Sequence, residues 1–233
     1  MTFFYRAFSG LPRRLLLLLP LALLSLAAAA QGQLVQYRAA KNQLDQGHYE
    51  VAMKQLQPLA QPVNHFAQAP DAGYLYAVAA TRLGQWAEAE QMLNLVRHEY
   101  PTYAALNEVL YLQGQVSFEL GDYDNALRTL GQLPAEQYAG LREAMQTSYL
   151  AKLKDRPTWQ RLRQRYPNSK LVGRLYADFL LGGGSLADAD RQQLDALITQ
   201  VSPLADAQAV FETIDNNPAG MKYLLQTTSL LTL

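Results

Sequence analysis

A six-residue pattern, Gly-x-aromatic-x-x-Ala, occurs three times at a constant interval in this 233-residue chain. It begins at Gly47, Gly84 and Gly121, so that each copy starts 37 positions after the one before. A fixed period of this length is typical of chains that stack one supersecondary unit repeatedly. The sequence therefore predicts a repeat architecture, and such stacks usually bind other molecules rather than transform them.

Each repeat unit is predicted to be a pair of helices, because apolar residues recur at helical spacing on both sides of each glycine. The clear pairs are residues 34–46 with 49–60, 73–83 with 86–99, and 106–120 with 123–133. A fourth pair is predicted at 141–154 with 157–166, and a fifth at 170–181 with 185–201. Prolines near the ends of units are interpreted as turn signals, namely Pro58, Pro62, Pro70, Pro101 and Pro134. Strand signals are nearly absent, so we expect an all-α fold.

Small residues also recur with the period of 37. They occupy the first helices at Ala40, Ala77 and Gly114 and the second helices at Ala52, Ala89 and Ala126. Together with the turn glycine and its aromatic neighbour, they make residues 33–135 resemble the tetratricopeptide repeat family, whose units are helix pairs of about 34 residues. The resemblance implies an α-solenoid of antiparallel helix pairs, with about three clear and two degenerate repeats. The period of 37 residues is longer than the family's period of about 34. The resemblance therefore predicts the pairing of helices but not the superhelical pitch of the stack.

The first thirty residues have the pattern of a signal peptide. Arg6, Arg13 and Arg14 precede an apolar run at 15–26, and small residues at 27–30 suit cleavage after Ala30. We therefore expect a signal peptide at 1–30, a helical repeat domain at 31–202 and a C-terminal capping or docking segment at 203–233. An uncleaved anchor is the alternative, although the apolar stretch is shorter than the roughly 20 residues that span a membrane.

The chain contains no cysteine, which excludes disulfides, thiolate metal sites and a lipid-modified N-terminal cysteine. An exported chain without cysteine suits a bacterial periplasm or cell exterior, and this is the expected location. A tether to the membrane is expected only if the leader stays uncleaved.

Charge is unevenly distributed along the chain. Outside the leader there are 17 basic and 20 acidic residues, so nucleic acid is not an expected partner. A basic block in the fourth unit is a candidate patch for an acidic polymer, and its residues are Lys152, Lys154, Arg156, Arg161, Arg163 and Arg165. An acidic stretch follows at 178–215, so the alternative is that neighbouring helices neutralise one another.

Tyrosines follow the same period as the small residues. Tyr37, Tyr74 and Tyr111 each stand three residues before the small residue of a first helix. The family resemblance implies that this position faces a concave groove that holds peptides, and tyrosines suit recognition because they offer flat area and a hydroxyl at little entropy cost. The alternative is packing against the next unit. The candidate groove residues are Tyr37, Lys41, Tyr74, Arg82, Tyr111, Gln115, Phe118 and Glu119.

Residue patterns that carry catalysis are missing from the sequence. The histidines at 48, 65 and 98 are isolated from one another, and the glycines at 182–184 lack the lysine of a phosphate-binding loop. We expect no catalytic residue, metal site or cofactor. We interpret the chain as a non-enzymatic adaptor of the bacterial cell envelope that binds a peptide or protein. The alternatives are a glycan-binding or peptidoglycan-associated helical domain and an envelope assembly factor.

Overall fold

The computed structural model describes residues 30–182, 190, 192–194 and 196. The predicted signal peptide, apart from residue 30, and the predicted C-terminal segment lie outside these residues, as does most of the second helix of the fifth pair. Every regular element in the described residues is a helix, so the predicted fold class, an all-α solenoid of helix pairs, is confirmed. The chain divides into two compact units, of which unit 1 ends at Leu120 and unit 2 begins at Gly121.

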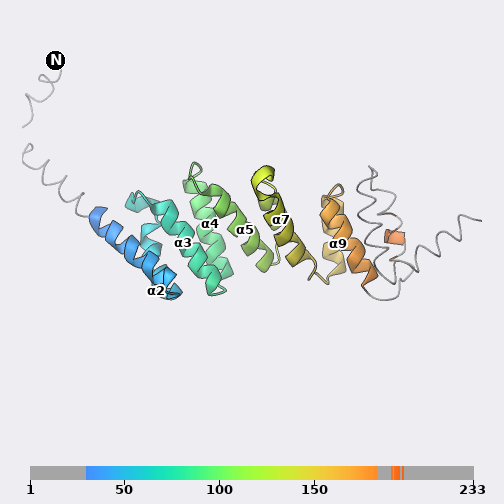
Figure 1. Cartoon of the computed structure of the whole chain (residues 1–233), viewed down its shortest axis with the longest axis horizontal. Coiled ribbons are helices and arrows are strands. Elements are labelled where there is room, and N and C mark those ends of the chain that lie inside the picture. The colour runs from blue at the N-terminus through green and yellow to red at the C-terminus, as the bar shows by residue number, and fades with distance from the viewer. Residues whose placement is uncertain (1–29, 183–189, 191, 195, 197–233) are drawn as a thin grey trace, which may run out of the picture. The chain divides into compact units, whose positions relative to one another are not determined.

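Unit 1 consists of helices that contact their neighbours in sequence. Residues 30–45 are helical, and α2 (Tyr49–Leu59), the short 3₁₀ helix η1 (Pro62–Asn64), α3 (Ala69–Arg82), α4 (Trp86–Glu99) and α5 (Leu106–Glu119) follow. Helix α3 packs against α2 and α4, α4 packs against α5, and α3 also touches α5, as Figure 1 shows. Contacts confined to near neighbours are what a solenoid requires.

The repeated glycines end the first helices as the sequence predicts. Gly47, Gly84 and Gly121 have φ angles of 79°, 71° and 77°, in the left-handed region that only glycine adopts at no steric cost. In the first two turns the amide that follows the glycine donates back across the helix end, from His48 to Gln43 at 2.8 Å and from Gln85 to Ala80 at 2.9 Å. This is the hydrogen bond of a Schellman motif. The glycines are therefore fixed by backbone geometry.

Two of the prolines interpreted as turn signals lie inside helices instead. Pro70 is in the first turn of α3, which begins at Ala69 rather than at residue 73. Proline is tolerated there because first-turn amides have no intrahelical acceptor. Pro58 lies inside α2, one residue before its end, so it does not stop the helix before itself. The sequence interpretation of these two residues was wrong.

The small residues of the repeat form the contact layer between helices. Ala40, Ala77, Ala52, Ala89 and Ala126 are fully buried, and Gly114 is buried too. A polar side chain, Gln113, is also buried between α4 and α5, where its amide donates to Asn94 Oδ1 at 2.6 Å and its oxygen accepts from Arg97 at 3.4 Å. Because both ends of this amide are hydrogen-bonded, its burial is compensated.

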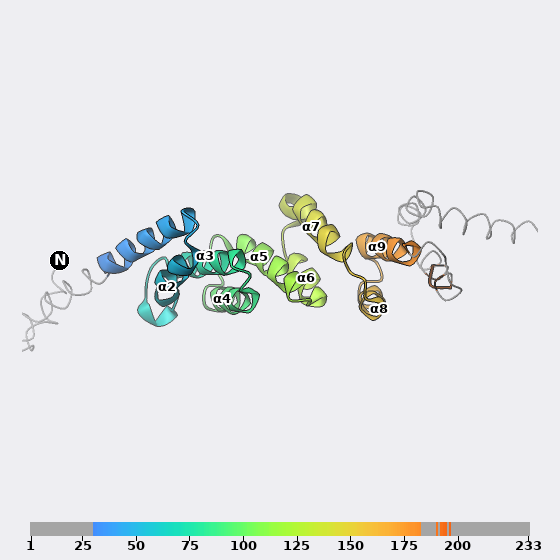
Figure 2. The same cartoon turned by 90° about the horizontal axis from the view of Figure 1, so that it is seen from below.

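Unit 2 contains α6 (Tyr123–Leu130), α7 (Ala135–Leu150), α8 (Arg156–Arg165) and α9 (Lys170–Leu181). Helix α9 contacts both α7 and α8, which the second view displays (Figure 2). Helix α7 begins six residues before the predicted start at 141. Its first turns are mostly exposed, so helix-forming residues rather than an apolar face determine where it starts.

Trp159 anchors the packing of unit 2. It is 1% exposed, its indole N–H donates to the carbonyl of Leu153 at 3.1 Å, and its ring stacks on Tyr176 with centroids 5.8 Å apart. No helix of the described residues is both long and apolar enough to cross a membrane.

Candidate functional site

All eight predicted groove residues belong to unit 1 and lie on three helices, residues 30–45, α3 and α5. The three tyrosines are half-buried, Lys41, Arg82 and Glu119 are exposed, and Gln115 is half-buried. Phe118 is only 3% exposed, so its side chain belongs to the packing rather than to an accessible face. Residues four or eight positions apart on a helix share a face, and we call the face bearing Tyr37, Lys41, Tyr74, Arg82, Tyr111, Gln115 and Glu119 the tyrosine face.

Tyr37 is positioned by an aromatic residue from the loop before α3. Its ring lies 5.8 Å from that of Phe66, centroid to centroid, with the planes tilted by 56°. Burial raises the pKa of the Tyr37 hydroxyl, and the nearby Asp71 carboxylate raises it further. Tyr37 therefore remains a neutral hydrogen-bonding group over the physiological range.

A fourth tyrosine, Tyr103, joins this region from the loop before α5. Its hydroxyl donates a hydrogen bond to the Asp71 carboxylate, which ties the start of α5 to the start of α3. The pKa of Tyr103 is raised, first by burial, then by this hydrogen bond, and further by the nearby Asp71, Tyr37 and Tyr74. Three tyrosines of unit 1 thus gather around one carboxylate.

Sequence reasoning missed Tyr103, although a signal for it exists. Phe66 and Tyr103 are also 37 positions apart, and each stands in the loop that precedes a first helix. Phe66 packs against Tyr37, and Tyr103 lies near Tyr74. The repeat therefore places a second aromatic residue beside the periodic tyrosine of the preceding unit.

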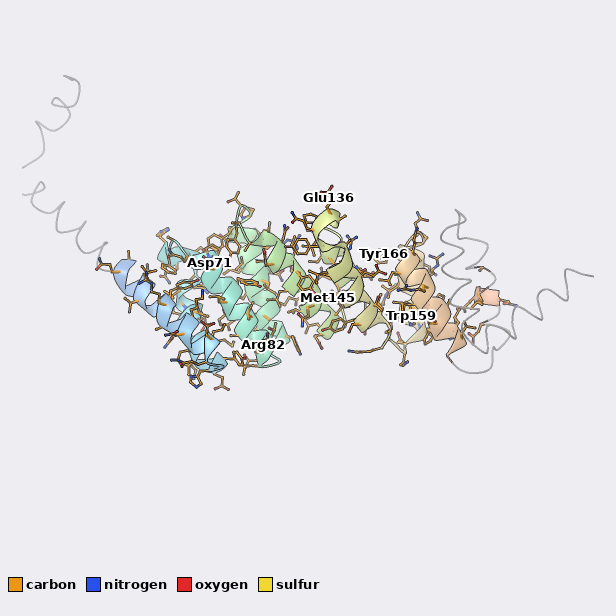
Figure 3. All side chains as sticks on the ribbon, viewed as in Figure 1. Asp71, Arg82, Glu136, Met145, Trp159 and Tyr166 are labelled. Atoms are coloured by element: carbon orange, nitrogen blue, oxygen red, sulfur yellow. The ribbon has the colours of Figure 1, made fainter. Side chains whose placement is uncertain are left out.

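The tyrosine face differs in charge along its helices. Asp71 and Arg82 lie at opposite ends of α3 (Figure 3). Eleven residues separate them, which corresponds to about 16 Å of helix. Along α3, the tyrosine face therefore presents a carboxylate on one side of Tyr74 and a cation on the other.

The basic block of unit 2 is largely engaged within the unit. Arg161 and Arg165 lie 3.8 Å and 3.5 Å from Oδ2 of Asp124. Arg156 forms an ion pair with Asp190 and lies over the ring of Phe179, with its guanidinium carbon 5.8 Å from the centroid. Since Asp190 belongs to the acidic stretch, this pair is the mutual neutralisation that the sequence left open as an alternative.

The remaining basic residues differ in exposure. Arg163 is 8% exposed and donates to the carbonyls of Tyr166 and Pro167, and burial lowers its pKa. Lys152 lies over the ring of Tyr149 at 5.5 Å. Lys154 is exposed. Of the six predicted patch residues, Arg163 is therefore buried, and Arg156, Arg161 and Arg165 have acidic partners.

Two hollows lie away from the tyrosine face. One of about 200 Å³ is lined by Met53, Lys54 and Tyr76 in unit 1, and one of about 380 Å³ is lined by Arg156, Asp178 and other residues of unit 2. Burial raises the pKa of Asp178, and Arg174 opposes this rise. Neither hollow is lined by a predicted groove residue.

No set of three metal-binding side chains comes together anywhere in the described part of the chain. His48 is hydrogen-bonded to Gln43 at 2.8 Å, and His98 to Glu99 at 2.9 Å. These histidines have local partners on the surface, and the geometry around them offers no arrangement for acid–base catalysis by convergent groups.

Comparison with known proteins matches two stretches of the chain to one family. A family model described as tetratricopeptide repeat matches residues 71–103 and 108–137. The two matches begin 37 positions apart, so they follow the same period as the turn glycines. They cover most of α3 with α4 and most of α5 with α6, and they support a tetratricopeptide repeat family for this part of the chain. No curated protein matches the chain significantly.

Proposed function

We propose that this chain is a non-enzymatic adaptor of the bacterial cell envelope that holds a peptide segment or protein surface on the tyrosine face of unit 1. Tetratricopeptide repeats generally mediate protein–protein interaction and typically lack catalytic activity. The observation that carries the proposal is the tyrosine recurring every 37 residues on the first helices and half-buried each time. Two of the three, Tyr74 and Tyr111, lie in the stretches that the family model matches.

The physical basis of the proposal is a preformed binding face. Tyr37 packs against Phe66, and the Tyr103 hydroxyl donates to Asp71, which stands one turn before Tyr74 on α3. Aromatic rings that are already ordered lose little entropy when a partner covers them, so more of the contact energy appears as affinity. The exposed Lys41 and Arg82 then supply polar contacts at the edge of the face.

Export is part of the proposal and rests on the leader pattern alone. The positive start, apolar run and small residues at 1–30 support secretion across a membrane with cleavage after Ala30. N-terminal sequencing of the protein isolated from its source checks this step, since a chain beginning at Gln31 is expected. A chain that retains residues 1–30 favours the tethered alternative instead.

Affinity capture with matched baits tests the adaptor function. The baits are the parent chain, a face variant Lys41→Glu/Arg82→Glu, and a control Arg38→Glu/Lys54→Glu. All four residues are exposed in unit 1, so each variant changes charge equally without removing core contacts. Circular dichroism spectra of the three baits must agree before capture is compared.

We expect a partner that the parent and the control retain and the face variant loses. The same partner retained equally by all three baits would place recognition elsewhere on the chain. Loss from both variants alike would indicate non-specific attraction to positive charge.

A further inference from the structure

The tyrosine face carries a repeated carboxylate that the sequence analysis did not use. Asp71 stands three residues before Tyr74 on α3, and Glu108 stands three residues before Tyr111 on α5. The two carboxylates are therefore 37 positions apart, like the tyrosines. Because residues three apart on a helix are neighbours on one face, each carboxylate lies one turn before a tyrosine ring.

Asp71 and Glu108 lie in the first turns of two neighbouring helices, α3 and α5. The hydrogen bond from Tyr103, three residues before α5, to Asp71, in the first turn of α3, brings the N-terminal ends of both helices together. Helices α3 and α5 touch each other, and helices in contact have axes about 8–10 Å apart, so Asp71 and Glu108 stand at the starts of two adjacent helices.

Neither carboxylate is neutralised within unit 1. No lysine, arginine or histidine of the described residues forms an ion pair with Asp71 or Glu108, although the basic residues of unit 2 do pair with acids. Glu108 is exposed and Asp71 is half-buried, with one oxygen accepting from Tyr103. Both retain oxygen lone pairs for a further donor.

A carboxylate beside an aromatic ring suits one class of ligand. A guanidinium can bond to the carboxylate and stack on the tyrosine at the same time, because its planar fork donates in two directions and its charge is attracted to ring faces. Two such positions on adjacent helices suit alternate residues of an extended peptide, whose side chains on one side are about 7 Å apart and are long enough to adjust their spacing.

We infer that the tyrosine face of unit 1 selects an extended peptide with two basic side chains on alternate residues, received by Asp71 with Tyr74 and by Glu108 with Tyr111. This inference rests on the proposed function and specifies the chemistry of the partner. Arg82 lies at the far end of α3, and Lys41 lies on the helix at 30–45, so the basic segment is expected at the starts of α3 and α5.

The alternative explanation for these two carboxylates is a structural role, and the experiment needs a control for it. An acid in the first turn of a helix stabilises the positive end of the helix dipole, and Glu136 lies in the first turn of α7 in unit 2. Glu136 is exposed, as Glu108 is, and belongs to the other unit. Glu136→Gln is therefore a matched control for loss of a first-turn charge.

The test uses fluorescence anisotropy of labelled peptides with the full-length chain. Three peptides share a flexible Gly-Ser frame and differ only in a central Arg-Ala-Arg, Gln-Ala-Gln or Glu-Ala-Glu. Each is titrated to about 1 mM protein against the parent, Asp71→Asn/Glu108→Gln, Asp71→Glu/Glu108→Asp and Glu136→Gln. Circular dichroism establishes that all four proteins are folded.

We expect the arginine peptide to bind the parent about tenfold more tightly than the glutamine peptide, and the acidic peptide to bind least. Asp71→Asn/Glu108→Gln should weaken the arginine peptide by about tenfold, as expected for the loss of two partly screened ion pairs. The charge-retaining variant should bind more tightly than the neutral one, and Glu136→Gln should bind as the parent does.

Three results would overturn the inference. The first is that the parent binds the glutamine or the acidic peptide as tightly as the arginine peptide. The second is that Asp71→Asn/Glu108→Gln leaves binding of the arginine peptide unchanged. The third is that the parent does not bind the arginine peptide at 1 mM protein. None of them decides the proposed function, because the capture experiment with Lys41→Glu/Arg82→Glu depends on other residues. If the face variant loses a partner in affinity capture but the peptides show no selectivity, the chain is an adaptor that recognises no basic segment.

Discussion

Gly73 of α3 and Val96 of α4 touch so closely that no side chain fits between the two helices. A Cβ atom placed on Gly73 would lie 2.4 Å from Cγ2 of Val96 and 3.6 Å from Cβ of Ala60. Val96 is fully buried and β-branched, so it has little freedom to rotate away. The close approach of α3 and α4 therefore depends on a glycine that is not one of the repeated turn residues.

Replacing Gly73 by alanine should destabilise unit 1. Overpacking in a filled core costs about 1–3 kcal/mol, and the better helix propensity of alanine returns up to about 1 kcal/mol. We expect the free energy of unfolding to fall by about 1–2 kcal/mol, measured by urea titration with circular dichroism and Trp86 fluorescence in a Trp159→Phe background.

Gly140→Ala in α7 provides the comparison. Gly140 is exposed and nothing lies within 4 Å of the added Cβ, so only the propensity gain of about 0.5–1 kcal/mol remains. The two substitutions should thus have opposite signs. A stabilised Gly73→Ala would show that α3 and α4 can separate at little cost.

The turn glycine Gly84 should resist substitution for a different reason. Its φ of 71° is unfavourable for residues with a Cβ, while the space around it is open. We expect Gly84→Ala to cost about 1–2 kcal/mol through the left-handed backbone and Gly84→Asn to cost less, because asparagine tolerates this region. Thermal melting of the two variants checks the order, and equal melting temperatures would contradict a backbone origin.

Much of the fold could be predicted from the sequence because the repeat encodes backbone geometry directly. The glycines at 47, 84 and 121 end helices because glycine adopts their φ without steric cost. The recurring alanines are buried because a small side chain lets two packed helices approach closely. Where the pattern depends on weaker signals, prediction was poorer. The start of α7 at Ala135 was placed six residues late, because its exposed first turns carry no apolar periodicity.

The candidate site could be predicted only in part. The period identified Tyr37, Tyr74 and Tyr111, but it did not show that Tyr103 would reach back to Asp71, since that contact depends on the path of a loop. Phe118 followed the same helical phase as the groove residues and is nevertheless buried. Periodicity gives the face of a helix, whereas burial depends on what the neighbouring elements cover.

Removing Asp124 should uncover positive charge on α8. Its carboxylate lies within 4 Å of Arg161 and Arg165, whose side chains are 62% and 59% exposed. Exposed pairs contribute at most about 1 kcal/mol, so Asp124→Asn should remain folded. Because the two guanidinium groups lose their counter-charge, we expect later elution from a heparin column.

Glu136→Gln makes the same change of net charge at the first turn of α7 and serves as the comparison. Equal shifts in elution for both variants would mean that heparin responds to total charge. A larger shift for Asp124→Asn would show that the basic block of unit 2 is masked in the native chain and is not an open polyanion site.

Alkaline pH should weaken unit 1 through Tyr103. Its pKa is raised by burial and by the hydrogen bond to Asp71, whereas in the unfolded chain it ionises near its ordinary value of 10.0. Below pH 10 both states carry the proton and the stabilisation is complete. Above pH 10 the unfolded state loses its proton first, so stability falls as pH rises toward the folded pKa.

We therefore expect the urea midpoint of the parent to decline between pH 9.5 and 11 and the decline to be smaller in Tyr103→Phe. It should not vanish, because burial also raises the pKa of Tyr37, Tyr76 and Tyr100. At pH 7 the variant should lose about 1 kcal/mol, the usual contribution of one hydrogen bond. Absorbance at 295 nm follows tyrosine ionisation in the same samples, and the folded parent should keep one more un-ionised tyrosine at pH 11 than the variant. An unchanged alkaline decline in Tyr103→Phe would mean that the Tyr103–Asp71 pair does not hold its proton against solvent, and that the starts of α3 and α5 are joined by packing alone.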